Sequence, residues 1–163
     1  MRRIEIVNPG HEGGKDGWRM PPYPDAQVTA VIALCREIVA RHDIDADCVL
    51  AHSDIAPGRK IDPGENFPWK RLHEAGVGHW VKPAIMARAP HRILSPGDVG
   101  DDVAYFQGEL ARYGYGVEET AIYDAQTERV VRAFQRHFRP KRVDGLGDVS
   151  TRRTLHALLE ALP

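Results

Sequence analysis

The chain has 163 residues, with 22 Lys and Arg against 23 Asp and Glu, so its net charge is close to zero. Such a balance provides no basic face for nucleic acid, which is therefore not an expected partner. Hydrophobic residues make up 42% of the sequence, as in ordinary globular domains, and no apolar run approaches the length of a transmembrane helix. The opening residues, MRRIEIVNPG, contain no apolar stretch of the kind found in signal peptides.

The first strongly periodic segment follows Pro24. Its apolar residues recur at three- and four-residue spacing, at Val28, Val31, Ile32, Cys35, Ile38 and Val39. This spacing predicts an amphipathic helix over residues 25–41. A short apolar run, Cys48 to Ala51, then suits a buried strand. With a further strand at the amino terminus, the order strand, helix, strand favours an α/β layer.

Two cysteines occur in the sequence, Cys35 on the apolar face of the predicted helix and Cys48 at the start of the predicted strand. Both are expected to be packed free thiols, since two cysteines in such positions do not form a disulfide framework.

The segment after this strand, HSDIAPGRKIDPGENFPW, places His52, Lys60 and Asp62 in one loop with several Pro and Gly residues. An imidazole and a carboxylate are good ligands for Zn²⁺, and a nearby ammonium can reach the same cavity without binding the metal. The combination indicates metal-assisted hydrolysis. An isolated set of this kind also fits an ordinary polar surface loop, so the flanking sequence has to decide between the two readings.

A short helix is predicted over residues 69–74, after Pro68, and the proline-containing stretch 81–93 is predicted to be a linker. Beyond it, three apolar stripes predict three helices. Their positions are Val103, Phe106, Leu110 and Tyr113 in the first, Val130, Val131, Phe134 and Phe138 in the second, and Leu155, Leu158, Leu159 and Leu162 in the third.

An internal repeat connects the last two helices, because TAIYDAQTERVVRAF and DGLGDVSTRRTLHAL align at a constant offset of 24 residues. Asp124 and Thr127 in the first copy match Asp148 and Thr151 in the second. An Asp-x-x-Thr sequence can cap a helix, because its side-chain oxygen accepts a hydrogen bond from a free backbone N–H.

Two motifs in the first half resemble the Amidase_2 family of N-acetylmuramoyl-L-alanine amidases. HSDIAPGRKIDPGENFPW resembles the zinc-ligand loop, and IEIVNPGHEGG resembles the central strand and the turn after it. The resemblance implies a zinc site with His52 and Asp62 as metal ligands. It also implies that Glu5, in the strand motif I-E-x-x-N, is the general base and that Lys60 stabilises the negative charge on the carbonyl oxygen. Read alone, Glu5 would be a solvent-facing strand carboxylate.

The family site uses two histidines and one aspartate, and its first histidine lies upstream of the glutamate strand. This chain begins four residues before Glu5, so we expect an amidase domain that lacks its amino-terminal part. The other histidines of this half, His11, His42, His73 and His79, have no spacing that favours metal binding. The expected fold class is accordingly α/β, a partial mixed-sheet amidase domain, followed by a small all-α three-helix domain.

The second half, from GDVGDDVAYFQGEL through both repeat copies, resembles a peptidoglycan-binding domain of the three-helix PG_binding_1 type. One departure is Thr120-Ala121 in the first turn, where the family usually has Asp-Gly, whereas the second turn keeps Asp144-Gly145. The expected organisation is an amidase-like domain at 1–80, a linker at 81–93 and a peptidoglycan-binding domain at 94–163.

Together, the two resemblances imply zinc-dependent hydrolysis of the amide between N-acetylmuramic acid and L-alanine, with peptidoglycan or muropeptides as partners. A tethered binding module raises the local concentration of an insoluble substrate. The expected location is the cell envelope or periplasm, if an export signal lies upstream. The alternatives are a non-catalytic peptidoglycan-binding protein, a cytoplasmic amidase that recycles anhydromuropeptides, and a generic zinc-binding or regulatory domain. The sequence does not specify an oligomeric state.

Overall fold

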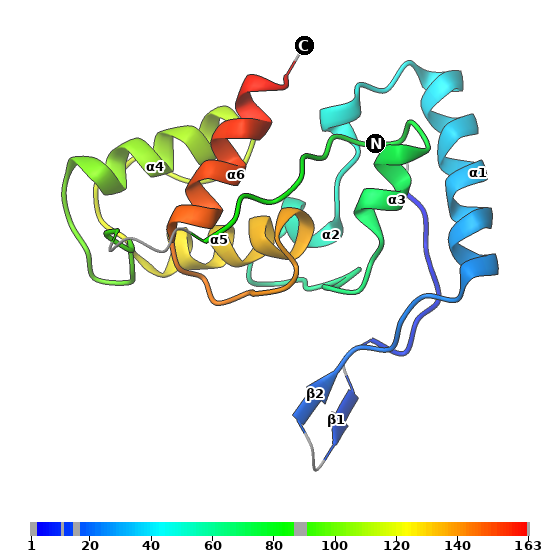
Figure 1. Ribbon diagram of the computed structural model, residues 1–163, viewed down its shortest axis with the longest axis horizontal. Coiled ribbons are helices and arrows are strands. Elements are labelled where there is room, and N and C mark those ends of the chain that lie inside the picture. The colour runs from blue at the N-terminus through cyan, green and yellow to red at the C-terminus, as the bar shows by residue number, and fades with distance from the viewer. Residues whose placement is uncertain (1–2, 11, 15–16, 87–90, 163) are drawn as a thin grey trace.

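The structure is a computed structural model that describes residues 3–10, 12–14, 17–86 and 91–162. Its elements, in chain order, are β1 (Glu12–Gly14), β2 (Gly17–Arg19), α1 (Asp25–His42), the 3₁₀ turn η1 (Ala46–Cys48), α2 (His52–Ile55), α3 (Trp69–Glu74), α4 (Asp101–Arg112), α5 (Ala125–Phe138) and α6 (Val149–Glu160). Helices α4, α5 and α6 pack together on one side, α1 and α3 lie on the other with α2 between, and the β1–β2 hairpin projects away (Figure 1).

The predicted α/β fold class is wrong. The sheet in the described part of the chain is the antiparallel pair β1–β2, and helices make up most of the remaining regular structure. Neither Ile4 to Asn8 nor Cys48 to Ala51 forms a strand, because a strand requires a hydrogen-bonded neighbour and none of the described segments pairs with them. The alternation itself persists in residues 4–8, since Ile4 and Ile6 pack on the core while Val7 is 86% exposed.

The amino-terminal half has a small core under α1. Helix α1 matches its predicted range and buries Val28, Val31 and Cys35. Its cluster also contains Phe67 and residues of α3, which forms over the range predicted for it. Both cysteines are free; Cys35 is buried as expected, but Cys48 is exposed at the end of η1, so its predicted packing is wrong.

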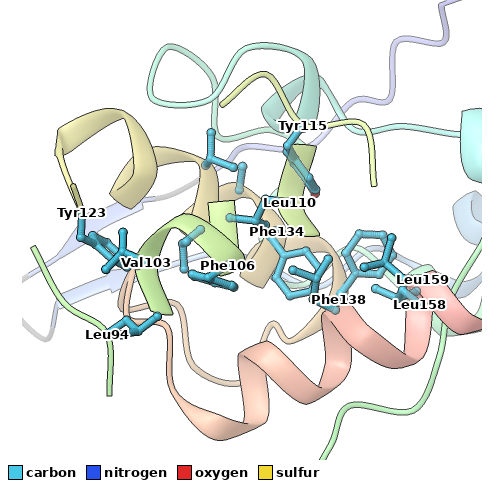
Figure 2. Packing of buried hydrophobic residues seen from close by; sticks show 14 residues of the cluster. Leu94, Val103, Phe106, Leu110, Tyr115, Tyr123, Phe134, Phe138, Leu158 and Leu159 are labelled. Atoms are coloured by element: carbon cyan, nitrogen blue, oxygen red, sulfur yellow. The ribbon is translucent and has the colours of Figure 1, made fainter. Parts of the chain in front are cut away.

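The three predicted carboxy-terminal helices are present and enclose a core of fully buried side chains (Figure 2). Val103, Phe106 and Leu110 of α4 meet Phe134 of α5 and Leu158 of α6 in this cluster. The apolar stripes read from the sequence are the faces that the helices bury. This half of the protein therefore has the larger and more enclosed core.

Both repeat copies cap their helices as predicted. The Asp124 carboxylate accepts a hydrogen bond from the Thr127 amide at 2.8 Å, and the Asp148 carboxylate accepts one from the Thr151 amide at 2.7 Å. Each Asp-x-x-Thr motif thus satisfies an otherwise unpaired N–H in the first turn of its helix.

A buried glutamine holds the turn before each capped helix, at Ala121 in the first repeat copy and at Gly145 in the second. The alignment of the two copies did not reveal this feature. Gln107 accepts a hydrogen bond from the Ala121 amide at 3.0 Å and donates one to the Thr127 hydroxyl at 2.9 Å. Gln135 accepts from the Gly145 amide at 2.8 Å and donates to the Thr151 hydroxyl at 3.1 Å. The two halves of the repeat are therefore held by the same polar arrangement.

The turn residues differ in a way that predicts opposite effects of two substitutions. Ala121 has φ 60° and Gly145 has φ 73°, both in the left-handed region that disfavours L side chains. We expect Ala121→Gly to raise the free energy of unfolding by about 0.5–1 kcal/mol, because it removes this strain. Gly145→Ala should lower it by more than about 1 kcal/mol, since a Cβ there would lie 2.8 Å from Glu128 Cγ. Urea unfolding measures both changes; a loss of stability in Ala121→Gly would contradict the argument.

The predicted division into residues 1–80, 81–93 and 94–163 stays a prediction. In the described part of the linker, the backbone forms hydrogen bonds with α6. The Ala84 amide donates to the Thr154 hydroxyl at 3.0 Å, and the Ser150 hydroxyl donates to the Ala84 carbonyl at 2.5 Å. Trp80, at the end of the first half, packs against both hydrophobic clusters. Among the described residues, no helix has the length and apolar character that crossing a membrane would require.

Candidate functional site

The loop after α2 brings Asp62 alongside His52, the two predicted zinc ligands. His52 opens α2, and its Nδ1 lies 2.9 Å from Oδ2 of Asp62. The Ser53 amide also donates to the Asp62 carbonyl at 3.0 Å, which fixes the backbone of one residue against the other. The side chains remain accessible, with exposed fractions of 34% for His52 and 61% for Asp62. The structure thus places the two residues side by side, and their role as zinc ligands stays a prediction.

Local sequence explains why the loop returns to His52. After α2 the chain reverses at Pro57-Gly58, where the amides of Arg59 and Lys60 both donate to the Ala56 carbonyl at 3.1 Å. Gly58 has φ 79°, a conformation available to glycine without strain. This tight reversal brings Asp62 back alongside the start of α2.

A cavity of about 410 Å³ lies beside the pair and is also lined by Glu5, Asn8 and Gly10. The remaining walls are largely apolar side chains from α1, the chain before α2 and the chain before α3. A concave site with apolar walls and a few polar groups at one side is typical of small-molecule binding. Three of the four predicted site residues therefore share one cavity.

Glu5 reaches this cavity from the extended amino-terminal segment. Ile4 and Ile6 turn toward the hydrophobic cluster, so the alternation of the extended chain turns Glu5 outward. The Glu5 carboxylate pairs with the Arg3 guanidinium, and its side chain is 75% exposed. Glu5 is thus open to solvent and charged partners at the rim of the cavity.

Lys60 is the predicted site residue that the structure does not bring to the cavity. It lies two residues before Asp62, is exposed, and is not among the residues that line the cavity. Within the described part of the chain its ammonium group forms no ion pair. A long, free side chain at this position leaves the ammonium able to move toward a bound molecule.

His52 and Asp62 supply two of the three protein ligands that a catalytic zinc ion usually takes. Zn²⁺ binds imidazole nitrogen at about 2.0–2.1 Å and carboxylate oxygen at about 2.0–2.2 Å, so two tetrahedral ligands lie about 3.4 Å apart. The observed 2.9 Å between His52 Nδ1 and Asp62 Oδ2 is a hydrogen-bond distance and is shorter than this value. In the described residues one group of three possible ligands lies within 4.8 Å, namely Asp45, Asp47 and Cys48 near η1, and it includes neither His52 nor Asp62.

The other histidines of this half lie elsewhere. His73 faces the Gly78 carbonyl at 3.0 Å, and His79 faces the Tyr113 hydroxyl at 2.8 Å. Burial lowers the pKa of His79, which favours its neutral form. His42 lies at the end of α1 away from the cavity, and His11 is outside the described residues. His42, His73 and His79 are not among the residues that line the cavity.

Tyr23 belongs to the site but was not predicted. Its hydroxyl donates to the Pro63 carbonyl at 2.8 Å, directly after Asp62, and its ring packs edge-on against Phe67. Burial, together with the charge of Asp62, raises the pKa of Tyr23 to about 12, so the hydroxyl keeps its proton and donates. The sequence offers no signal for this contact, because Tyr23 lies 40 residues before Pro63.

Asp54, in the same turn as His52, also escaped the sequence analysis. Its Oδ2 accepts from the Ala51 amide at 2.7 Å and lies 2.7 Å from His137 Nδ1, while its Oδ1 accepts from the Tyr115 hydroxyl at 2.8 Å. Asp54 and both partners are buried. A carboxylate on the turn that carries His52 is therefore held by two residues of the carboxy-terminal half.

A second hollow of about 330 Å³ lies between α4 and α6. It is lined by Asp102, Tyr105, Glu109 and His156 among others, and Tyr105 is 65% exposed. Its polar groups are partly paired, since His156 Nδ1 lies 3.2 Å from a Glu109 oxygen.

An imidazole and a carboxylate beside an apolar cavity, with a further carboxylate at its rim, define a candidate metal-dependent hydrolytic site. Residues 3–65 match the model of the Amidase_2 family, "N-acetylmuramoyl-L-alanine amidase", and residues 99–155 match that of PG_binding_1, "Putative peptidoglycan binding domain". Both resemblances read from the sequence are thereby confirmed.

One curated relative matches nearly the whole chain. The chain is 39% identical over 162 residues to N-acetylmuramoyl-L-alanine amidase AmiD of Escherichia coli, a match that spans 96% of this chain and 56% of AmiD. The chain thus corresponds to little more than half of that relative's length.

Two solved amidase structures are also similar to this chain over most of its length. A complex of E. coli AmiD with anhydro-N-acetylmuramic acid-L-Ala-D-gamma-Glu-L-Lys superimposes with a TM-score of 0.76 at 37% identity, over 94% of this chain and 58% of the other. AMPDH3 from Pseudomonas aeruginosa superimposes with a TM-score of 0.66 at 33% identity, over 91% and 58%. The described fold is therefore an amidase-like fold without the mixed sheet expected from the sequence.

Proposed function

We propose that this chain hydrolyses the amide bond between N-acetylmuramic acid and L-alanine in peptidoglycan fragments, with a zinc ion bound by His52 and Asp62. The observation that carries the proposal is that both residues share one cavity with Glu5, in a segment of the Amidase_2 family. The similar AmiD structure, which is a complex with a substrate containing this linkage, supports the same choice of substrate.

The chain's own residues supply the remaining chemistry. A bound zinc ion would lower the pKa of a water molecule toward neutrality and polarise the scissile carbonyl. Glu5 accepts a proton as the water oxygen bonds to the carbonyl carbon, and it returns the proton to the alanine nitrogen as the C–N bond breaks. Tyr23 holds the backbone beside Asp62.

Lys60 is proposed to stabilise the negative charge that develops on the carbonyl oxygen once substrate fills the cavity. Lys60→Ala should therefore lower the hydrolysis rate about 10²-fold while the zinc content stays unchanged. Rates on a muropeptide, followed by chromatography, and metal analysis of the same samples measure the two effects. Lys70→Ala, which removes an exposed lysine of α3, is the matched control and should keep the full rate. Loss of zinc from Lys60→Ala would contradict this role.

For residues 99–155 we propose peptidoglycan binding, with the hollow between α4 and α6 as the contact surface. The exposed ring of Tyr105 and the polar groups around it suit a glycopeptide, because an aromatic ring offers an apolar face and a polar end. Since the proposed polymer lies in the cell envelope, we infer that the protein acts there or in the periplasm.

Two substrates separate the candidate functions. The full chain with added Zn²⁺ is incubated with purified peptidoglycan and, separately, with anhydro-N-acetylmuramic acid-L-Ala-D-γ-Glu-L-Lys. Release of free peptide stems from both supports the proposed amidase. Hydrolysis of the soluble compound alone, without pulldown on peptidoglycan, supports a cytoplasmic recycling amidase, a second candidate favoured by the anhydro substrate in the AmiD complex. Pulldown without cleavage of either substrate would leave a non-catalytic wall-binding protein and overturn the proposal.

A further inference from the structure

Helix α2, which carries His52, has only four residues, from His52 to Ile55. So short a helix has no stability of its own, because forming its first turn costs more free energy than its hydrogen bonds return. Its orientation must therefore come from tertiary contacts. In the structure those contacts come from α5, which packs against α2 although the two are about 70 residues apart in sequence (Figure 1).

Asp54 is the centre of this contact. It is 8% exposed, and both of its oxygens are engaged, Oδ1 by the Tyr115 hydroxyl and Oδ2 by the Ala51 amide and His137 Nδ1. A buried carboxylate without partners is strongly unfavourable, so Asp54 stays in this place only while its partners do. Since Asp54 also binds the Ala51 amide, it fixes the start of the turn at which His52 begins.

The two partners are themselves held in place. The His137 ring lies between Trp69, with ring centroids 3.8 Å apart, and Phe138, at 3.9 Å. Because a carboxylate only accepts hydrogen bonds, His137 donates from Nδ1. Burial, with the nearby charge of Asp54, raises the pKa of Tyr115 well above its usual value, so its hydroxyl stays protonated and donates.

The end of the loop that follows Asp62 also contacts α5. Arg136 Nε lies 3.1 Å from Glu65, three residues after Asp62, and the side chains of this ion pair are only 16% and 25% exposed. Gly58, at the loop reversal, lies so close to α5 that an added Cβ would be 2.2 Å from Arg129 Cδ. Contacts from α5 thus reach residues 52–65, called the metal loop below, near their start, middle and end.

We propose that the peptidoglycan-binding half is a positioning element of the hydrolytic site, in which His137 and Tyr115 act through Asp54 to set the place of His52 relative to Asp62. This inference rests on the proposed zinc site, and it differs from the tethering role expected of such a module. A tether acts only on insoluble substrate, whereas a positioning element affects zinc binding and the hydrolysis of soluble substrate as well.

The test uses point variants of the full chain. His137→Phe keeps an aromatic ring between Trp69 and Phe138 but removes the donor, and Tyr115→Phe removes only a hydroxyl. We expect each to weaken zinc binding about tenfold, measured by competition with a chromophoric chelator, since lost outer-shell partners typically cost 10- to 100-fold. His137→Asn, which can place an amide donor near the former Nδ1, should recover part of the affinity.

Tyr123→Phe is the matched control. Tyr123 is also buried in the carboxy-terminal half, and its hydroxyl donates to the Gly145 carbonyl at 2.6 Å, away from the metal loop. It should lose a similar amount of stability as Tyr115→Phe but keep the wild-type zinc affinity. If His137→Phe and Tyr115→Phe both bind zinc like the wild type while remaining folded, the contact is packing alone and the proposal fails.

Hydrogen exchange gives a second readout that needs neither zinc nor amidase activity. The amides of Ala51 and Ser53 bond to Asp54 and Asp62 respectively, so their exchange reports the two ends of the site. In His137→Phe and Tyr115→Phe both amides should exchange about tenfold faster or more, but not in Tyr123→Phe. Unchanged exchange in the first two variants would overturn the positioning role even if the chain proved inactive as an amidase.

Discussion

Replacing His52 by Ala is expected to abolish zinc binding by the full chain and to reduce amide hydrolysis to the background rate. His52 and Asp62 are the two proposed ligands, and the described residues bring their side chains together at the cavity. Removing a direct ligand should weaken metal binding by more than the 10- to 100-fold typical of an outer-shell partner, so we expect a loss well above about 100-fold. Zinc content after dialysis and the rate of muropeptide hydrolysis measure the two effects.

The control for this variant is His73→Ala. His73 is also exposed and bonded through Nδ1, but to the Gly78 carbonyl on a surface away from the cavity. It should keep both zinc and activity. Retention of zinc by His52→Ala, with loss in His73→Ala, would show that the metal lies elsewhere and would remove the basis of the proposed chemistry.

Glu5→Gln is expected to lower the hydrolysis rate by about 10²- to 10⁴-fold without changing zinc affinity, because Gln keeps the size of the side chain but cannot accept the proton. The variant also breaks the ion pair with Arg3, which is exposed and contributes little stability. Single-turnover rates on a soluble muropeptide, with zinc affinity measured in parallel, separate the chemical step from metal binding.

Glu37→Gln provides a matched control, since Glu37 is an exposed glutamate paired with Arg41 on α1. It should leave the rate unchanged. A near wild-type rate for Glu5→Gln would mean that the carboxylate at the cavity rim takes no part in proton transfer, and another group would have to be sought among the cavity residues.

The helices were predicted well from the sequence because the residues that define a helix lie within a few positions of one another. The three- and four-residue spacing of Val28, Val31 and Cys35, or of Val103 and Phe106, is the face that each helix buries. The Asp-x-x-Thr caps were equally readable, since cap and partner are three residues apart. The strands were not, because an extended apolar run becomes a strand only when another segment pairs with it, and pairing is a non-local property.

In the candidate site, too, contacts between residues close in sequence were predictable and contacts between distant residues were not. His52 and Asp62 are ten residues apart, and the Pro and Gly residues between them allow the sequence to indicate that the chain turns back. Asp54 and His137 are 83 residues apart, and neither lies in a pattern that marks it out. The position of Lys60 outside the cavity was also unpredictable, because spacing along a loop does not fix the direction of a flexible side chain.

Trp80 lies where the two segments of the chain meet, and its indole contributes to both hydrophobic clusters. Cleaving the polypeptide there would leave one half without a side chain that covers its interior, whichever fragment retained the residue. Fusion or truncation variants that separate the halves at this point would therefore expose an apolar surface to solvent. The same indole is placed to act as a built-in fluorescent probe of whether the halves stay joined.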